Sequence, residues 1–407
     1  MLDPRMTGQG GLSVKIVDVQ TYVVGNPPPH FGGRFWVFLK LTTDGGVVGY
    51  GEVYAAPFRP HVVAAMIEDV CVRKVLGEDP FKIERLWRRI YSSGYTQHPD
   101  LSLVAVLSGI EMACWDIVGK ELDKPAYELL GGQVHERLRS YSYLYPQDSD
   151  RADVYLDPDL AAERAAEYVA MGFTAVKFDP LGDYSAFDPR QPSLEALARC
   201  EQFVARVREA VGTAADLLFG THGQLTPSGA IRLGRRLERY EPLWFEEPVP
   251  PENVEAMARV ARQIAVPVAT GERLATKYEF ARILEAGAAS VLQMALGRVG
   301  GLLEAKKIAG MAEAHYAQIA PHMYCGPISA AADVQLSTCS PNFLIQESIL
   351  TGGGFHTEIV KTPIQWQEGY LIPPSGPGLG VELDESVLGK YPYTDQALHL
   401  EMVEEPV

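Results

Sequence analysis

The sequence predicts an α/β protein in which an α+β domain is followed by a barrel of alternating strands and helices. In the first third of the chain, a group of strand patterns precedes a group of helix patterns, which is the order of an α+β domain. From residue 138 onward the two kinds of pattern alternate, and eight expected strands fit a β/α barrel of ordinary size. An open doubly wound sheet is the alternative, but no glycine-rich nucleotide-binding turn follows an early strand.

The α+β domain is expected to begin after a flexible extension, residues 1–12. Alternating apolar and polar residues then predict three strands, and the turn at Asp44-Gly45-Gly46 joins the last two as a hairpin. Apolar residues at helical spacing predict three helices after the strands. The strands are expected at residues 14–24, 34–43 and 47–52, and the helices at residues 61–75, 81–91 and 103–120. A pair of glycines at 131 and 132 marks the expected boundary, so we assign residues 13–132 to this domain.

The barrel is expected in residues 133–365. Short apolar runs bounded by turn-forming residues predict its strands. They are expected at residues 138–143, 175–179, 217–220, 243–245, 266–270, 290–294, 318–321 and 343–346. After His356 the pattern gives way to a segment rich in proline and glycine, so we assign residues 366–407 to a C-terminal return.

Composition narrows the class of protein. A hydrophobic content of 47% and a charged content of 22% are typical of a soluble globular protein with a large core. The net charge of −16 argues against nucleic acid or an anionic membrane surface as a partner, although a bound cation would still admit an anionic substrate. The five cysteines are scattered, and no signal peptide or apolar run of membrane-spanning length is visible. A cytoplasmic protein is therefore expected.

Two neighbouring strands of the expected barrel end on acidic residues. The strand at 243–245 is followed by Glu246 and Glu247, and the strand at 266–270 is followed by Gly271 and Glu272. Parallel strands joined by a helix carry their carboxyl ends on the same side of a sheet, so Glu246 and Glu272 are expected side by side. Adjacent carboxylates repel unless a cation joins them, and oxygen ligands select Mg²⁺ or Ca²⁺. Solvated acids partnered by Arg273 are the alternative.

Four stretches carry a resemblance to a known family. In order, WFEEP, TGER, VLQMALGRVGGLLEAKKIA and IAPHMYCGPIS resemble the mandelate racemase/muconate lactonising branch of the enolase superfamily, most closely its sugar-acid (galactonate-type) dehydratases. The resemblance covers residues 14–383. It implies a (β/α)7β TIM-like barrel with residues 13–132 as a capping domain, to which the C-terminal return runs back. It also implies Mg²⁺ as cofactor and removal of a proton α to a carboxylate.

The resemblance assigns roles to residues on the second and third barrel strands. His222 matches a histidine that serves as acid or base, but Gly220 stands where relatives have an aspartate metal ligand. Lys177 matches a lysine that can act as base, and Asp179 lies two residues further on. Both side chains point into the barrel, because side chains alternate along a strand. Asp179 is therefore a candidate third metal ligand beside Glu246 and Glu272. A buried ion pair between strands is an equally weighted interpretation of Lys177.

Further candidates lie on the last strands and in the capping loops. His322 matches the base of the seventh strand, although Ala295 stands where relatives place the aspartate that orients it. Glu347 matches a position that hydrogen-bonds the substrate carboxylate in relatives. The candidate substrate-binding residues are Arg34, Tyr54 and Arg273.

These features predict a lyase that uses Mg²⁺ to dehydrate an aldonic or aldaric sugar acid. The ion on Glu246 and Glu272 would bind the substrate carboxylate and stabilise the enediolate. Of His222 and His322, one would remove the α-proton and the other would protonate the departing β-hydroxyl. The expected partner is a small acid sugar, and the protein is expected to be a homo-oligomer.

Two alternative functions remain open on sequence alone. Racemisation or cycloisomerisation in the same family would use Lys177 as a base. A divergent protein that keeps the barrel without turnover is the other alternative, and Gly220 and Ala295 are the features that favour it.

Overall fold

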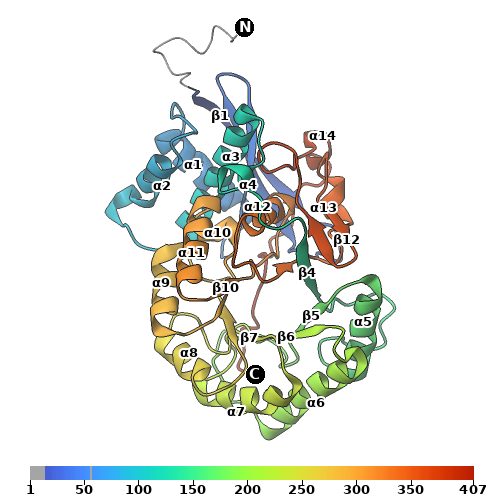
Figure 1. The fold of residues 1–407 in the computed structure, drawn as a ribbon. Helices are drawn as coiled ribbons and strands as arrows, with labels where there is room; N and C mark the ends of the chain where they lie inside the picture. The colour runs from blue at the N-terminus through green and yellow to red at the C-terminus, as the bar shows by residue number, and fades with distance from the viewer. Residues whose placement is uncertain (1–13, 56) are drawn as a thin grey trace.

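The computed structural model describes residues 14–55 and 57–407, so the predicted flexible extension lies outside the described residues. The N-terminal part is an antiparallel sheet, in the order β1-β2-β3, packed against helices (Figure 1). This is the predicted α+β order, and we call it the capping region. Its elements are β1 (Ile16–Gly25), β2 (Phe35–Thr43), β3 (Val48–Val53), α1 (Pro60–Lys74), α2 (Ile83–Tyr91), α3 (Leu101–Leu122) and α4 (Ala126–Leu129).

Helix α3 forms the centre of the capping region. Asp100 caps its first turn by accepting a hydrogen bond from the Leu103 amide, and Asp123 ends it in a left-handed conformation. Among the described helices, α3 alone is long and apolar enough to cross a membrane, but 83% of its apolar window is buried inside the protein. A Cβ on Gly51 of β3 would overlap the Gly109 carbonyl, so glycine lets the sheet approach this helix closely. Helix α3 is therefore a core helix.

The predicted eight strands form the barrel. Strands β4 to β10 are parallel neighbours in chain order, and β11 pairs with β4. An isolated bridge joins Ile319 of β10 to Phe343, three residues before β11, so the ring closes. The barrel strands are β4 (Leu138–Tyr143), β5 (Ala175–Phe178), β6 (Asp216–Gly220), β7 (Trp244–Glu246), β8 (Val268–Thr270), β9 (Val291–Leu292), β10 (Gln318–Ile319) and β11 (Gln346–Glu347).

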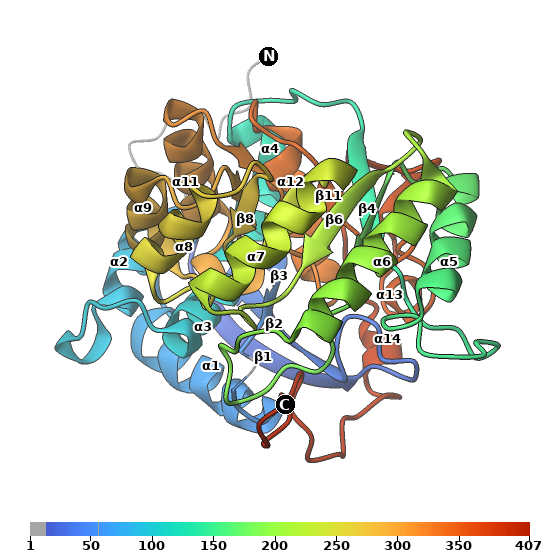
Figure 2. The same cartoon turned by 90° about the horizontal axis from the view of Figure 1, so that it is seen from below.

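Helices surround these strands, and Figures 1 and 2 show α5 to α9 along the outside of the ring. Several begin at a side-chain cap, namely Asp157, Ser193, Thr226 and Asn253 for α5 to α8. The helices are α5 (Pro158–Met171), α6 (Leu194–Val211), α7 (Pro227–Leu237), α8 (Val254–Ala261), α9 (Thr276–Ala286), α10 (Leu296–Val299), α11 (Leu302–Ala314) and α12 (Pro327–Thr338). The architecture is the predicted (β/α)7β barrel with a capping region.

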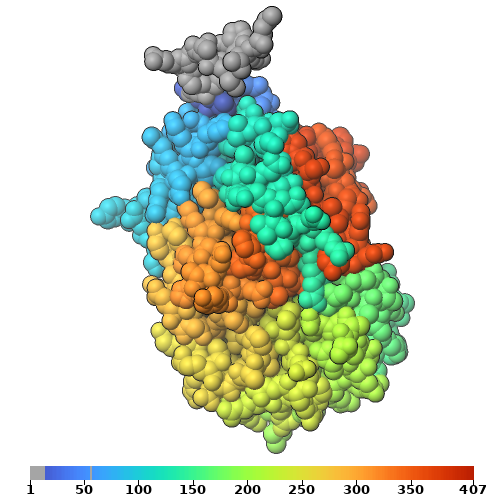
Figure 3. Space-filling model, in the orientation of Figure 1, coloured from blue at the N-terminus to red at the C-terminus, as the bar shows by residue number. Residues whose placement is uncertain are grey.

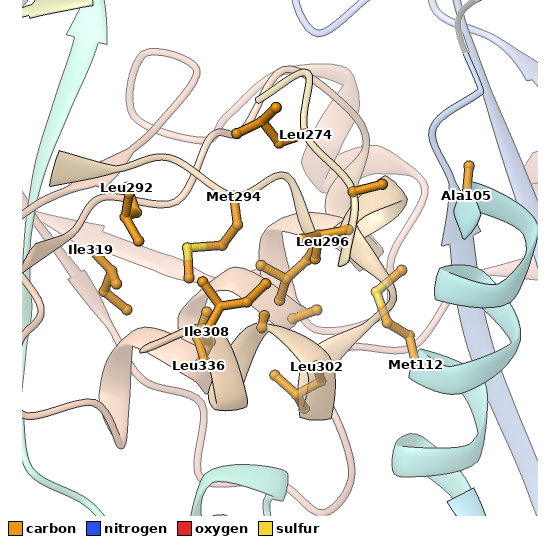
Figure 4. Packing of buried hydrophobic residues seen from close by; sticks show 14 of the residues in the cluster. Ala105, Met112, Leu274, Leu292, Met294, Leu296, Leu302, Ile308, Ile319 and Leu336 are labelled. Carbon is orange, nitrogen blue, oxygen red and sulfur yellow. The ribbon is translucent and has the colours of Figure 1, made fainter. Parts of the chain in front are cut away.

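The core has an inner and an outer part. Inside the barrel, one buried cluster takes a residue from each strand or its immediate flank: Tyr141, Ala175, Leu218, Trp244, Ala269, Val291, Ala320 and Ile345. Outside the strands, a larger cluster runs between the barrel helices and the capping region. Figure 4 shows Met294, Leu296 and Ile308 packed together, with Met112 of α3 approaching them. The two regions therefore share one continuous apolar core.

The C-terminal return differs from the sequence prediction by containing regular structure. Strands β12 (Gln365–Gln367) and β13 (Tyr370–Ile372) form a hairpin, and β13 pairs antiparallel with β4 of the barrel. Three residues a strand are too few for a periodic pattern to show. Short helices α13 (Phe355–Glu358) and α14 (Glu385–Leu388) flank the hairpin. Beyond it the chain contacts the capping sheet, where Gly25 donates to the Tyr391 carbonyl (Figure 3 shows this segment in red).

Candidate active site

The carboxyl ends of the barrel strands bring two acids and a histidine together. Glu246 ends β7, Glu272 follows β8, and His222 follows β6. One ligand atom from each of these three side chains lies within 4.8 Å of the other two. Glu246 and Glu272 are therefore adjacent, as the strand pattern predicts.

Glu246 is held by a buried network. Its Oε1 accepts a 2.6 Å hydrogen bond from Lys177 Nζ, and its Oε2 accepts from Gln293 and Trp244. Lys177 is only 1% exposed. Burial alone would lower the pKa of this lysine, but the carboxylates of Glu246 and Glu347 outweigh burial and raise the pKa. Lys177 therefore stays protonated, which suits a counter-ion better than a base.

Glu272 lies between two imidazoles. His322 Nε2 is 3.4 Å and His222 Nε2 is 3.8 Å from the same carboxylate oxygen, Oε2. That oxygen is buried and has no hydrogen-bond partner within the part of the chain that the structure describes. Burial would raise the pKa of Glu272, but the positive charges of Lys177 and of the histidines His322 and His222 when they are protonated outweigh burial and lower the pKa. A charged carboxylate oxygen thus remains free to receive a ligand.

His222 has a carboxylate partner on its other ring nitrogen. Its Nδ1 lies 3.1 Å from Asp179 Oδ2, which also accepts a 2.7 Å hydrogen bond from the Tyr184 hydroxyl. The Tyr184 ring contacts the imidazole edge-on at 4.9 Å. Burial would lower the pKa of His222, but Glu272 and Asp179 outweigh burial and raise the pKa to about 9. Asp179 thus orients the ring so that Nε2 faces Glu272.

His322 has a different environment. Its Nδ1 is buried and makes no hydrogen bond to any described residue, which agrees with the alanine at position 295. The ring stacks on Tyr54 at 6.0 Å, and the Arg298 guanidinium lies over that tyrosine at 3.5 Å. Burial lowers the pKa of His322. The two histidines therefore approach Glu272 with unlike supporting groups.

The space above Gly220 is bordered by other side chains. A Cβ at this position would lie 3.2 Å from the Tyr143 hydroxyl oxygen and 3.6 Å from Lys177 Cε. Asp179, the predicted substitute ligand, is outside the three-residue group and is engaged with His222. Its role as a metal ligand stays a prediction, and its contacts favour orientation of the histidine.

The remaining predicted residues are distributed unevenly. Glu347 accepts a hydrogen bond from the Met323 amide, and its Oε1 lies 3.7 Å from Lys177 Nζ, so it belongs to the same buried network as Glu246. Tyr54 stacks on a histidine, as described. Arg273 pairs with Glu247 and donates to the His222 carbonyl at 2.8 Å. It therefore stabilises the backbone turn at His222 and is not directed at the carboxylates of Glu246 and Glu272. Arg34 is exposed in the loop between β1 and β2 (residues 26–34), which we call the capping loop.

Sequence reasoning missed Tyr143, Tyr184 and Arg298. Tyr143 ends the first barrel strand, and the strand-end rule that identified Glu246 would have identified this tyrosine too. Tyr184 lies in an irregular loop, and Arg298 lies in a short helix, so neither has a pattern that predicts a role.

The donor set fits a hard divalent cation. Glu246 and Glu272 supply carboxylate oxygens, and the unpartnered Oε2 of Glu272 is buried beside them. Mg²⁺ commonly takes one or two protein carboxylates and completes its shell with water and substrate oxygens. The loss of an aspartate at position 220 therefore leaves a sufficient set.

Comparison with known proteins gives consistent results. Residues 31–131 match the family described as mandelate racemase/muconate lactonizing enzyme, N-terminal domain, and residues 160–387 match the family described as enolase C-terminal domain-like. The chain is 37% identical over 385 residues to a D-galactonate dehydratase of Ralstonia nicotianae, covering 92% of this chain and 94% of the relative. A D-galactonate dehydratase of Klebsiella pneumoniae is 35% identical, with 86% and 89% covered.

Solved structures agree with this result. A mandelate racemase/muconate lactonizing enzyme from a Sulfitobacter species superposes with a TM-score of 0.94 at 50% identity, covering 97% of this chain and 99% of the other. A candidate member of the same family from Labrenzia alexandrii also gives a TM-score of 0.94, at 63% identity, with 96% and 99% covered. The likeness therefore extends over both the capping region and the barrel.

Proposed function

The chain belongs to the mandelate racemase/muconate lactonizing enzyme family of the enolase superfamily, and on this premise we propose that it is a Mg²⁺-dependent hydro-lyase that dehydrates an aldonic or aldaric sugar acid. One observation carries the proposal: the Glu272 carboxylate, adjacent to Glu246, is approached by the Nε2 atoms of His222 and His322. A substrate held at the two carboxylates would meet both imidazoles. The D-galactonate dehydratases among the relatives support this reaction class.

Glu246 and Glu272 would hold the cation. When bound, Mg²⁺ supplies a Lewis acid that stabilises the negative charge on the substrate carboxylate as the α-proton leaves. Lys177 holds Glu246 in place through their 2.6 Å hydrogen bond. Glu347 extends the same network from the last strand, close to where the substrate carboxylate would lie.

The two histidines divide the proton transfers. Asp179 accepts from Nδ1 of His222 and stabilises its imidazolium form, so this side chain is suited to give a proton to the departing β-hydroxyl, which leaves as water. His322 has no carboxylate on Nδ1, and its burial favours the neutral imidazole. Its Nε2 is suited to take the α-proton. Loss of water then yields the enol of a 3-deoxy-2-keto acid.

Racemisation or cycloisomerisation through Lys177 is less well supported by these contacts. A lysine acts as a base only in its neutral form, and the ion pair with Glu246 keeps this one charged. Arg34, Tyr54 and Arg273 stay predicted substrate-binding residues. Of these, Tyr54 contacts the imidazole of His322, and Arg273 contacts the backbone carbonyl of His222.

Dehydration is tested directly with a panel of stereoisomeric aldonic and aldaric acids. Purified protein is stripped with a chelator, and formation of 2-keto acid is measured with and without added Mg²⁺. We expect turnover of at least one acid, lost on chelation and restored by Mg²⁺. The His322→Asn variant serves as the inactive control. No keto acid from any panel member, with Mg²⁺ bound, would contradict the proposal.

Restoring the carboxylate at position 220 is expected to tighten Mg²⁺ binding. Gly220→Asp would place an anionic oxygen near Lys177 and Glu246, where the nearest obstacle to its Cβ is a tyrosine hydroxyl. Added negative charge and one more oxygen ligand should raise the affinity by roughly tenfold. Gly220→Asn, of the same size without charge, is the matched control in calorimetric titration. Equal affinity in the wild type and Gly220→Asp would show that the site is already complete.

Location and assembly are also proposals. All five cysteines are buried and free, which supports a reducing, cytoplasmic location. The substrate is a small acid, and we expect neither nucleic acid nor a membrane as partner. The expected homo-oligomer is measured by light scattering at several protein concentrations.

A further inference from the structure

We propose that residues 397–405, which we call the C-terminal strap, are part of the active site and position the aromatic rings beside both histidines. The strap contacts two separate parts of the molecule, the loop after β5 and the loop between β1 and β2. In Figure 1 the chain end overlies the ring of barrel helices, and Figure 2 shows that it lies outside this ring; the residues before it contact the capping sheet. The assignment of acid–base roles to the histidines rests on the proposed function, whereas the contacts do not.

The C-terminal end of the strap is joined to the loop after β5. The Val403 amide donates to the Tyr184 carbonyl at 2.9 Å, and the Ala186 amide donates to the Val403 carbonyl at 2.9 Å. Ser185 Oγ donates to the Glu405 carbonyl at 2.7 Å. These bonds form a short parallel bridge. The loop that they hold carries Tyr184, whose hydroxyl and ring contact Asp179 and His222.

The N-terminal end of the strap is held by His399. This side chain is 5% exposed, and its Nε2 lies 3.1 Å from the Gly32 carbonyl of the capping loop. Its ring packs against Tyr54 at 4.9 Å and edge-on against Phe35 at 5.6 Å. A Cβ on Gly33, which has φ of +99°, would overlap the His399 ring, so glycine is required for this close approach. His399 therefore fills the space between the capping loop and Tyr54.

The two ends of the strap correspond to the two histidines of the site. Tyr184, whose loop is held by the C-terminal end of the strap, contacts His222. Tyr54, against which His399 of the N-terminal end packs, stacks on His322. Aromatic contacts of this kind limit the planes that an imidazole can adopt. The strap is thus a common support for both rings, and His399 is a positioning residue for His322.

The strap can be altered without opening the core. The side chains of Leu400, Met402 and Val403 are 56%, 47% and 40% exposed, so the segment is held by its backbone bonds and by His399. A segment with few buried apolar contacts opens locally at low cost, while the rest of the fold persists. Variants at these positions are therefore expected to fold.

The reactivity of individual histidines toward diethyl pyrocarbonate, followed by mass spectrometry, tests the inference without a substrate. In His399→Ala we expect His322 to react about fivefold or more faster, and in Val403→Pro we expect the same of His222, because each loses its cover by local opening. His399→Phe refills the space and should restore the slow reaction of His322. Leu400→Ala is the matched strap control, and exposed His315 is the internal control in every variant.

Wild-type rates at His222 and His322 in both variants, or a His399→Phe protein as reactive as His399→Ala, would overturn the inference. Once an active substrate is found, kcat should fall in His399→Ala with a smaller change in KM, and His399→Phe should recover it. The labelling result stands whether or not the protein dehydrates sugar acids. A result that contradicts the role of the strap can therefore be told apart from one that contradicts the proposed function.

Discussion

Replacing His222 by asparagine is expected to lower kcat for dehydration by roughly 10²–10⁴, the usual contribution of a positioned acid or base. Asparagine retains a polar group near Asp179 but has no proton to give at the position of Nε2. Because the imidazole lies 3.8 Å from Glu272, its loss removes the group that faces the bound substrate. We expect the same range for His322→Asn, whose Nε2 faces the same oxygen.

Steady-state kinetics on the acid identified by the panel check this prediction, with His315→Asn, at an exposed position, as the control. Mg²⁺ affinity is measured in parallel, because a ring nitrogen of His222 lies within 4.8 Å of a carboxylate oxygen of each glutamate and could share a cation with them. A fall in kcat with unchanged Mg²⁺ affinity identifies an acid. A matching fall in affinity identifies a metal ligand, and activity within a few-fold of wild type leaves His222 with a structural role only.

Glu272→Gln is expected to lower Mg²⁺ affinity by about 100-fold or more, since even groups that only support a ligand contribute 10–100-fold. The amide replaces a charged carboxylate whose Oε2 is buried and free of hydrogen bonds among the described side chains. It also removes the negative charge between His222 and His322. Turnover should therefore be lost together with the ion.

Calorimetric titration with Mg²⁺ measures this loss, and Glu252→Gln, at an exposed position, is the charge-matched control. Glu246→Gln should also weaken binding, but it leaves Lys177 buried without its 2.6 Å partner. Breaking a buried ion pair costs about 3–5 kcal/mol of stability, so Glu272→Gln is the cleaner variant. A wild-type protein that binds no divalent ion at millimolar concentration would show the two-carboxylate site to be wrong.

Most of the fold could be predicted from local patterns. The three capping strands, the three helices after them and the eight barrel strands overlap the predicted ranges, although β11 (Gln346–Glu347) shares one residue with the strand predicted at 343–346. The hairpin at Gln365–Ile372 was missed because its strands are three residues each. Periodicity needs several residues to show, and the pairing of β13 with β4 depends on a contact far away in the sequence.

The sequence predicted which residues belong to the site better than it predicted which of them contact one another. Strand-end acids and family motifs identify Glu246, Glu272, His222 and His322, and the structure brings these four together. Asp179 was predicted as a metal ligand, but its observed partners are His222 and Tyr184. Side-chain direction along a strand follows from the sequence, whereas the choice among neighbours a few ångströms apart does not.

Local sequence patterns are sufficient to predict which residues end the parallel strands, and hence that Glu246 and Glu272 lie at one mouth of the barrel. That inference needs only the two-residue period of a strand and the fixed hand of a strand–helix–strand unit. The tertiary structure alone decided that Lys177 pairs with Glu246, that Asp179 orients His222, and that His399 reaches Tyr54 from 345 residues further along the chain. Such contacts depend on how separately folded segments pack, and no local pattern records which distant side chain fills a given space.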